Sequence, residues 1–319
     1  ALQLQFGLRW EDTQFATREF DARSAAEVRA AGFQVAPANG RATTVPGLVY
    51  QFMSQPKTTR ASGYDNLFPS ASAKYAFTPS LQAHVGYSAT ISRPALGNLA
   101  GVWVFNENSQ TVDVPNPNLL PERSRNYTGR IAYYFEPVGS VALTTFQNDI
   151  SNSVVNDEFS AADFGYEDDP TYSTYRFTSV GNIPGVTRVR GYTLEYSQAL
   201  SFLPGVLKGL NASASYTRNY ASRIKPGMVP HMFGSSLSFR HRRLSLGLSG
   251  KYTDATPFNV AGTVFRKLRT MIDLNGAFQL TRKTSVFFHA RNITNEPEYR
   301  YQSDPTIITQ YVTFGTILT

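Results

Sequence analysis

Hydrophobic and polar residues alternate along several long stretches of the chain. In the clearest one, odd positions are apolar and even positions polar or small, as in Leu81-Gln-Ala-His-Val-Gly-Tyr-Ser-Ala-Thr-Ile-Ser92. A period of two residues predicts a β-strand with one apolar and one polar face. Strands of soluble domains usually have about 5 or 6 residues, whereas about 9 to 11 tilted residues cross a membrane. This stretch therefore predicts a membrane-crossing strand.

The same alternation recurs from one end of the sequence to the other. An early strand is expected over Leu2–Phe15 and another over Arg123–Phe135. Further along, Leu244, Leu246 and Leu248 lie on the opposite phase to the small residues between them. We expect about twelve such strands in all. Aromatic residues gather near the strand ends, where amphipathic rings suit the two interfaces of a bilayer.

The connections between these strands alternate between short and long. Short turns are expected at residues 78–80, 137–139, 201–209, 240–243 and 281–283, and longer loops at 94–122, 153–176, 222–230, 255–266 and 293–310. Short turns and long loops therefore lie at opposite ends of the sheet. That asymmetry is typical of an outer-membrane barrel and has no counterpart in a soluble β-sandwich.

The connection after the first strand is long enough to carry structure of its own. It contains the sequence Ser24-Ala-Ala-Glu27, in which the serine can cap a helix and the glutamate can reach back to it. Gly32 follows at a distance that suits a left-handed helix end. We expect a short surface helix on this loop.

Composition excludes several classes of protein. Charged residues make up 17% of the 319 residues, and no apolar run is long enough for a transmembrane helix. Average hydropathy is uninformative for a barrel, because polar lumenal residues cancel apolar lipid-facing ones. The net charge is +7, but the basic residues are scattered rather than gathered on one face. We therefore expect no nucleic-acid partner.

Signals for an enzyme or a resident cofactor are weak. The sequence has no Cys, no Gly-x-Ser-x-Gly elbow and no Gly-rich phosphate loop, and its four His residues lack metal-ligand spacing. An acidic stretch between Asp157 and Asp169 could offer carboxylates to a divalent cation, but it lacks the spacing of a calcium loop. We predict no catalytic residues, no cofactor and no metal site.

Five segments together resemble the TonB-dependent receptors of the Gram-negative outer membrane. They are residues 66–75 (NLFPSASAKY), 87–94 (YSATISRP), 116–126 (NPNLLPERSRN), 188–196 (RVRGYTLEY) and 290–297 (ARNITNEP). Each segment alone is a weakly specific match to the family, but all five occupy the place in the strand order where the family has them. The segments from Arg93 to Pro94 and from Asn116 to Glu122 are read as fixing loop exits and strand register.

The resemblance implies a fold and a function. Residues 1–319 would form the C-terminal part of a transmembrane antiparallel β-barrel, as the last twelve of 22 strands, with the plug domain and the N-terminal strands outside this chain. Such a receptor imports a scarce, bulky nutrient across the bacterial outer membrane without breaking bonds. The resemblance implies a TonB-type partner, contact with lipid and lipopolysaccharide, and most commonly a ferric siderophore; oligosaccharide or cobalamin also fits.

Candidate ligand contacts are aromatic and polar residues of the long loops, which could either touch a ligand or pack the loops together: Trp103, Phe105, Asn106, Tyr166, Tyr172 and Tyr175. Two other classes of protein remain open. A passive porin-like channel would be a complete small barrel in which residues 2–10 pair with residues 311–319. A soluble β-sandwich would bury its apolar strand faces instead of turning them to lipid.

Overall fold

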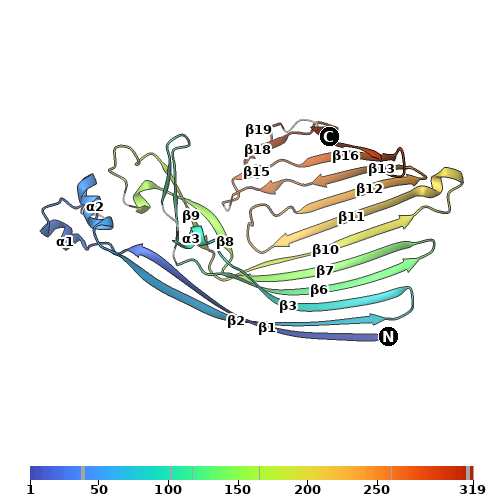
Figure 1. Cartoon of the computed structure of the whole chain (residues 1–319), viewed down its shortest axis with the longest axis horizontal. Coiled ribbons are helices and arrows are strands. Elements are labelled where there is room, and N and C mark those ends of the chain that lie inside the picture. The colour runs from blue at the N-terminus through green and yellow to red at the C-terminus, as the bar shows by residue number, and fades with distance from the viewer. Residues whose placement is uncertain are drawn as a thin grey trace.

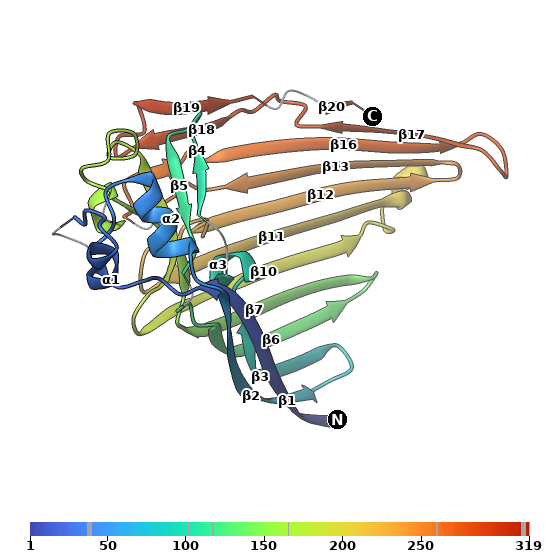
Figure 2. The same ribbon diagram turned by 60° about the vertical axis from the view of Figure 1, so that its left-hand side comes forward.

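The computed structural model describes residues 1–36, 40–100, 103–116, 118–164, 166–259, 261–313 and 317–318. Its main element is one antiparallel sheet of twelve strands in the order β1-β2-β3-β6-β7-β10-β11-β12-β13-β16-β17-β20. Figures 1 and 2 show it as a curved wall of tilted strands, with β1 at one edge and β17 near the other. The predicted fold class, an antiparallel β-sheet of the barrel type, is confirmed.

Most strands of the main sheet are long enough to cross a bilayer. They are β1 (Leu2–Phe20), β2 (Lys57–Ala76), β3 (Leu81–Ser92), β6 (Glu122–Phe135), β7 (Gly139–Ser151), β10 (Val186–Ala199), β11 (Leu210–Ala221), β12 (His231–His241), β13 (Leu244–Thr253) and β16 (Arg269–Gln279). The last two strands of the sheet, β17 (Ser285–Arg291) and β20 (Ile317–Leu318), are shorter. The first strand extends beyond the predicted end at Phe15. It does so because β2 starts early enough to pair with it as far as Phe20↔Lys57.

The short turns lie at one end of the sheet and the long loops at the other, as predicted. Figure 1 places the N-terminus and the short turns at the right, and the helices and extra strands at the left. No described helix has the length and hydropathy needed to span a bilayer.

The two faces of the sheet differ in polarity as the alternation predicts. On the outward face, Leu246 and Leu248 are 36% and 43% exposed although both are apolar. On the opposite, lumenal face, Arg130 forms an ion pair with Glu195 and donates to the Thr144 hydroxyl at 2.9 Å. An exposed apolar face excludes the soluble sandwich, which would bury it.

The long loops carry the remaining elements. Three are helices, α1 (Ala25–Ala30), α2 (Val45–Met53) and α3 (Leu96–Ala100), and two are 3-10 turns, η1 (Ala161–Phe164) and, on a short turn, η2 (Gly205–Gly209). The others form two small sheets, one ordered β4 (Val104–Asn106), β5 (Thr111–Val114), β9 (Arg176–Asn182) and β8 (Val154–Phe159), and one ordered β14 (Thr256–Pro257), β15 (Val264–Arg266), β18 (Glu298–Gln302) and β19 (Ile308–Val312).

The predicted capping box begins α1. The Glu27 amide donates to Ser24 Oγ at 3.3 Å, and the Ser24 amide donates to Glu27 Oε2 at 2.7 Å. Gly32 follows the helix with φ +87°, the left-handed conformation that glycine adopts without strain. The sequence analysis missed α2, although Thr44 caps it by accepting from the Gly47 amide at 3.3 Å.

The two edges of the main sheet lie apart. β1 and β20 end the strand order on opposite sides, and no pairing joins them within the described ranges. The porin-like alternative predicts a strand over residues 311–319, but Tyr311 lies in β19 and pairs with Tyr299 of β18 in a loop sheet. Residues 314–316 and 319 of that predicted strand lie outside the described residues. The described part of the chain therefore does not form the self-closed barrel that the porin-like alternative requires.

Candidate functional site: a vestibule among the long loops

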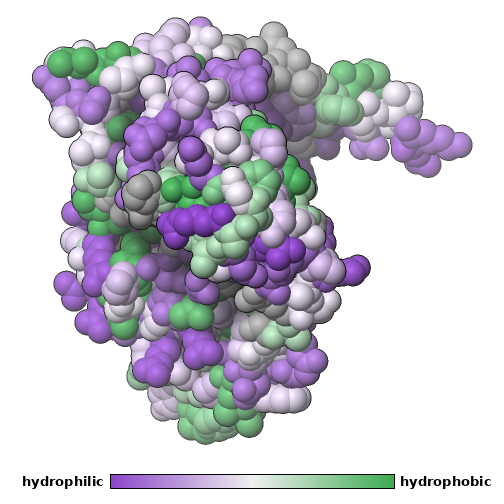
Figure 3. Space-filling model, turned by 90° about the vertical axis from the view of Figure 1, so that its left-hand side faces the viewer, coloured by the Kyte–Doolittle hydropathy of each residue, from purple (hydrophilic) through white to green (hydrophobic). Residues whose placement is uncertain are grey.

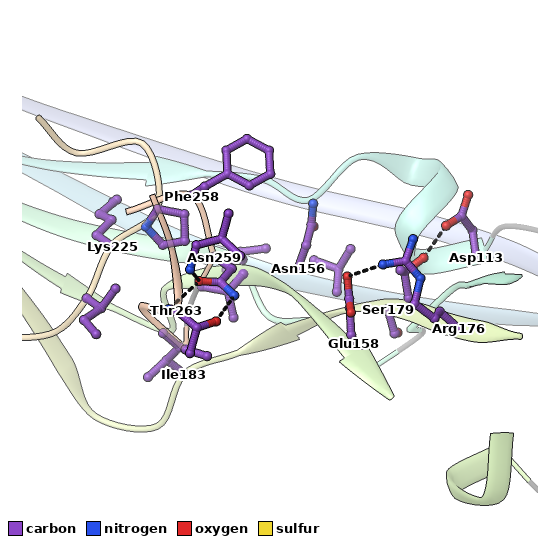
Figure 4. A pocket seen from close by; sticks show the side chains of 18 of the residues that line it. Asp113, Asn156, Glu158, Arg176, Ser179, Ile183, Lys225, Phe258, Asn259 and Thr263 are labelled. Carbon is purple, nitrogen blue, oxygen red and sulfur yellow. Dashed lines mark hydrogen bonds and ion pairs between the residues drawn. The ribbon is translucent and has the colours of Figure 1, made fainter. Parts of the chain in front are cut away.

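A cavity of about 1550 Å³ opens among the long loops at the end of the sheet opposite the short turns. We call it the vestibule. Its lining comes from all five long loops after β3, including Asn98, Asp113, Asn156, Glu158, Arg176, Ser179, Lys225, Phe258, Asn259, Thr263, Arg300 and Gln310. Figure 4 shows Glu158 and Arg176 on one side of it, and Phe258, Asn259 and Thr263 on the other.

One wall of the vestibule is the sheet β4-β5-β9-β8, which has a small hydrophobic core of its own. Phe177 and Val112 are fully buried there, and Tyr175 is 9% exposed. Aromatic rings surround Phe177, with the Phe164 and Tyr166 centroids each 5.4 Å away. Aromatic pairs at such distances add to the free energy gained by burial. This wall of the vestibule therefore has a packed aromatic core.

Five of the six predicted ligand contacts belong to this aromatic core. Trp103, Tyr166, Tyr172 and Tyr175 pack in or against it, and Phe105 contacts Tyr172 at a ring distance of 4.7 Å. Asn106 is exposed at the end of β4, where its Oδ1 accepts from the Ser109 amide at 3.2 Å. None of the six lines the vestibule. The structure thus brings the five aromatic residues together as packing, and ligand contact by any of the six stays a prediction.

The first long loop is tied to this wall through Arg41. Its guanidinium donates to the Phe164 carbonyl at 3.0 Å and to the Tyr166 hydroxyl at 2.7 Å. Its carbon atom Cζ also lies 4.0 Å from the centre of the Tyr166 ring, within the range of a cation–π interaction. Arg41 therefore links two loops that lie far apart in the sequence.

The opposite wall is the sheet β14-β15-β18-β19, organised around one carboxylate. Glu298 has a side chain only 14% exposed, and its oxygens lie 3.0 Å from Arg266, 3.8 Å from Arg269 and 3.7 Å from Arg300. The Arg300 guanidinium stacks 3.8 Å from the centre of the Phe258 ring and donates to Gln310 Oε1 at 2.7 Å. Arg300 is thereby held rigidly at the vestibule surface.

The ionisable residues of the vestibule leave a small positive excess. Arg176 lies 3.6 Å from Glu158, and both side chains are about two-thirds exposed, so this ion pair contributes little to stability. Asp113 accepts from the Thr178 hydroxyl. The Lys225 ammonium forms no ion pair or hydrogen bond with any side chain in the described part of the chain. Lys225 is thus a cation that a ligand can reach.

Two of the acidic residues between 157 and 169, Asp163 and Asp169, cap turns of the loop. Asp163 Oδ2 accepts from the amide and the hydroxyl of Ser160, both at 2.8 Å, and these hydrogen bonds hold the pKa of Asp163 below its ordinary value. Asp169 Oδ1 accepts from the Thr171 and Tyr172 amides at 2.9 and 2.8 Å. No group of three or more metal-ligating side chains occurs among the described residues.

The motif positions act as the sequence predicts, by fixing where loops leave the sheet. Asn116 Nδ2 donates to the Val180 carbonyl at 2.9 Å, and Glu122 Oε1 accepts from the Val154 amide at 2.6 Å. These two contacts join the barrel rim to the loop sheet that walls the vestibule. Arg93, directly after β3, forms an ion pair with Glu11 of β1, which lies two strands away in the sheet.

The family model described as TonB dependent receptor-like, beta-barrel matches residues 1–293. The chain belongs to the TonB-dependent receptor β-barrel family. Barrels of this family reside in the outer membrane, where strands turn an apolar face to lipid. No curated protein matches the sequence.

Solved structures of receptors and transporters share the fold of this receptor barrel. The ferric enterobactin receptor PfeA of Pseudomonas aeruginosa gives a TM-score of 0.58 at 16% identity, over 99% of this chain and 50% of that one. The siderophore receptor PiuA of Acinetobacter baumannii gives 0.61 at 15% identity, over 99% and 40%. The copper transporter OprC gives 0.64 at 13% identity, over 99% and 44%. The receptor barrel thus spans about half the length of these chains or less, and the likeness shows the fold.

Sequence reasoning missed the vestibule residues of this receptor barrel. Lys225, Phe258 and Arg300 lie in three different long loops, and each is an ordinary loop residue by its local sequence. The signal available was the alternation of short and long connections, which places every long loop at one end of the barrel. It indicates where a site lies but not which residues of each loop face it.

Proposed function

We propose that this receptor barrel is the C-terminal barrel part of an outer-membrane TonB-dependent transporter that takes up a ferric siderophore. Membership of the family supports active uptake of a scarce nutrient. Among the structures that share the fold are receptors whose own titles name ferric enterobactin, ferric catecholates and siderophores. As a proposal, residues 1–319 are accompanied in the whole protein by a plug domain and by further strands that close the barrel.

The observation that carries the proposal is the vestibule. Its volume of about 1550 Å³ exceeds the range of about 300–1,000 Å³ typical of small-molecule pockets, as a bulky ligand requires. Amide and hydroxyl groups line it beside apolar side chains such as Ile183, and hydrophilic and hydrophobic residues are mixed on this end of the molecule (Figure 3). Among the charged lining residues, Arg176, Lys225 and Arg300 outnumber Asp113 and Glu158. Such a lining favours a polar ligand that carries negative charge. A ferric tris-catecholate carries negative charge, whereas cobalamin and neutral oligosaccharides do not.

Release of the ligand into the periplasm needs energy that the barrel does not provide. In this proposal a TonB-type protein, driven by the inner-membrane proton gradient, acts on the plug region. The chemistry of the nutrient is unchanged, so the receptor barrel has no catalytic residue. Lipid and lipopolysaccharide surround its outward face, and the nutrient is the ligand that it transports.

A binding experiment on the whole receptor tests the substrate class. Tryptophan fluorescence is followed during titration with a ferric tris-catecholate, with cobalamin and with a neutral oligosaccharide. We expect saturable quenching with the ferric complex alone. Lys225→Ala should weaken that binding about tenfold, because a hydrogen bond to a charged group is worth roughly 1.5–3 kcal/mol.

The matched control for this experiment is Lys208→Ala, which removes an exposed lysine from the short turn at the far end of the barrel. It should leave the affinity unchanged. If cobalamin or the oligosaccharide bound more tightly than the ferric complex, the proposed substrate would be that class and not a ferric siderophore. Uptake of the ferric complex by cells that lack a TonB-type protein would contradict active transport.

A further inference from the structure

The outward face of four adjacent strands changes from apolar to basic toward the long loops. Figure 1 shows β6, β7, β10 and β11 side by side. Deep in the sheet, one row across these strands is Ile131↔Leu143↔Leu194↔Tyr216. All four side chains are apolar or aromatic, as lipid contact requires.

The basic residues are scattered along the sequence, but the strand register brings five arginines together on this outward face, near the long loops. We call them the arginine patch: Arg123, Arg125, Arg188, Arg190 and Arg218. The register places Arg125, Asp149 and Arg188 in one row and Gln147 and Arg190 in the next. Successive rows on one face are about 7 Å apart and neighbouring strands about 4.8 Å apart. The patch therefore has the dimensions of a lipid headgroup.

Only part of the positive charge of the patch is neutralised. Asp149 accepts from Arg188 Nε at 2.7 Å and from Arg188 Nη2 at 3.4 Å, a two-pronged ion pair. Arg218 lies over the Tyr220 ring at 4.6 Å. The guanidinium groups of Arg123 and Arg190 form no hydrogen bond or ion pair with any residue that the structure describes. Five arginines against one aspartate leave a net charge of +4.

A groove runs from the patch into the apolar part of the outward face. It has a volume of about 590 Å³ and is lined on this face by Tyr127, Gly129, Thr145, Gln147, Arg190, Tyr192 and Tyr220. Its floor lies where Gly129 pairs with Thr145, because a Cβ added to Gly129 would meet Thr145 Oγ1 at 3.2 Å. The absence of a side chain at Gly129 leaves a channel between tyrosine rings.

We propose that the patch and the groove bind one phosphate-bearing lipid of the leaflet next to the long loops. The guanidinium groups of Arg125 and Arg190 hold its phosphates, since arginine pairs with phosphate through two parallel hydrogen bonds. An acyl chain lies in the groove beside Gly129. Uncompensated arginines on a lipid-facing surface are costly, and anionic headgroups remove that cost. The excess of positive charge matches a headgroup with two phosphates.

The inference rests on the outward face of the barrel and not on the identity of the nutrient. The whole receptor is purified in detergent and incubated with diphosphorylated lipid A, with the same lipid stripped of its phosphates, or with inorganic phosphate. Native mass spectrometry then measures the bound lipid. We expect retention of the diphosphorylated lipid alone, at least tenfold above the stripped lipid.

Variants localise the binding. Replacing Arg125 and Arg190 together by Gln should reduce retention of diphosphorylated lipid A at least tenfold. The control replaces Arg242 and Arg282, exposed arginines of the short turns at the other end of the barrel, by Gln. It should retain the lipid like the unchanged receptor. The proposal would be overturned if the two double variants retained diphosphorylated lipid A equally. It would also be overturned if the unchanged receptor retained the stripped lipid as well as the diphosphorylated one, or if it bound inorganic phosphate but neither lipid. The comparison of lipids uses the unchanged receptor, so it stands even if a variant fails to fold.

Discussion

Placing an arginine at Leu248 tests which face of the sheet meets lipid. Leu248 pairs with Leu237 on one side and Leu274 on the other, so the Leu248→Arg side chain would emerge in a row of leucines. Leu248 is 43% exposed in the structure, and that exposed surface faces outward. The next residue, Ser249, faces the lumen and pairs with Asp273.

The depth of Leu248 sets the size of the effect. It is the fifth residue of β13. Four residues at about 3.3 Å each, along a strand tilted by about 40°, raise it about 10 Å above the start of the strand. The apolar band of such a barrel is about 25 Å tall, so Leu248 lies near its middle. An arginine there costs about 2–4 kcal/mol, which corresponds to a change of about 30- to 1,000-fold in the folding equilibrium.

The assay is reversible unfolding of the whole receptor by urea in the presence of lipid vesicles, followed by tryptophan fluorescence. Leu248→Arg should lose about 2–4 kcal/mol of unfolding free energy. Ser249→Arg should change it by less than about 1 kcal/mol, because the lumen is hydrated and Asp273 lies opposite. Equal losses, or a larger loss for Ser249→Arg, would show that the two faces are assigned the wrong way round.

Three further predictions concern the loops. Phe177→Ala should lower the unfolding free energy of the loop sheet by about 3–5 kcal/mol, so that protease cleaves this sheet while the barrel stays folded. The control Phe202→Ala, on an exposed turn, should not increase cleavage. Arg41→Gln should weaken the contact between two loops by roughly 1–2 kcal/mol, seen as faster amide exchange in both. The pKa of Asp163 is lowered by Ser160, so its contribution to stability is complete above the ordinary value of 3.8 and is lost as pH falls through the lowered pKa. Protease cleavage near Asp163 should therefore rise at low pH in the native receptor, and Asp163→Asn should abolish this rise.

The sequence by itself determined the strands, their faces and the ends at which loops lie. A period of two residues specifies a face because successive strand residues point to opposite sides, and the alternation in Leu244–Ser249 is strict enough to set it. The capping box at Ser24 could also be predicted from the sequence, because both of its hydrogen bonds join residues that are three positions apart.

Only the tertiary structure decided what the loops do. Phe177 and Trp103 lie in separate loops, and their packing depends on how β5 and β9 pair, which no local pattern encodes. The same holds for Tyr311, whose partner Tyr299 was predicted to be a loop residue. Strand faces are set by neighbours along the chain, whereas the vestibule and the arginine patch are set by register between segments far apart in sequence.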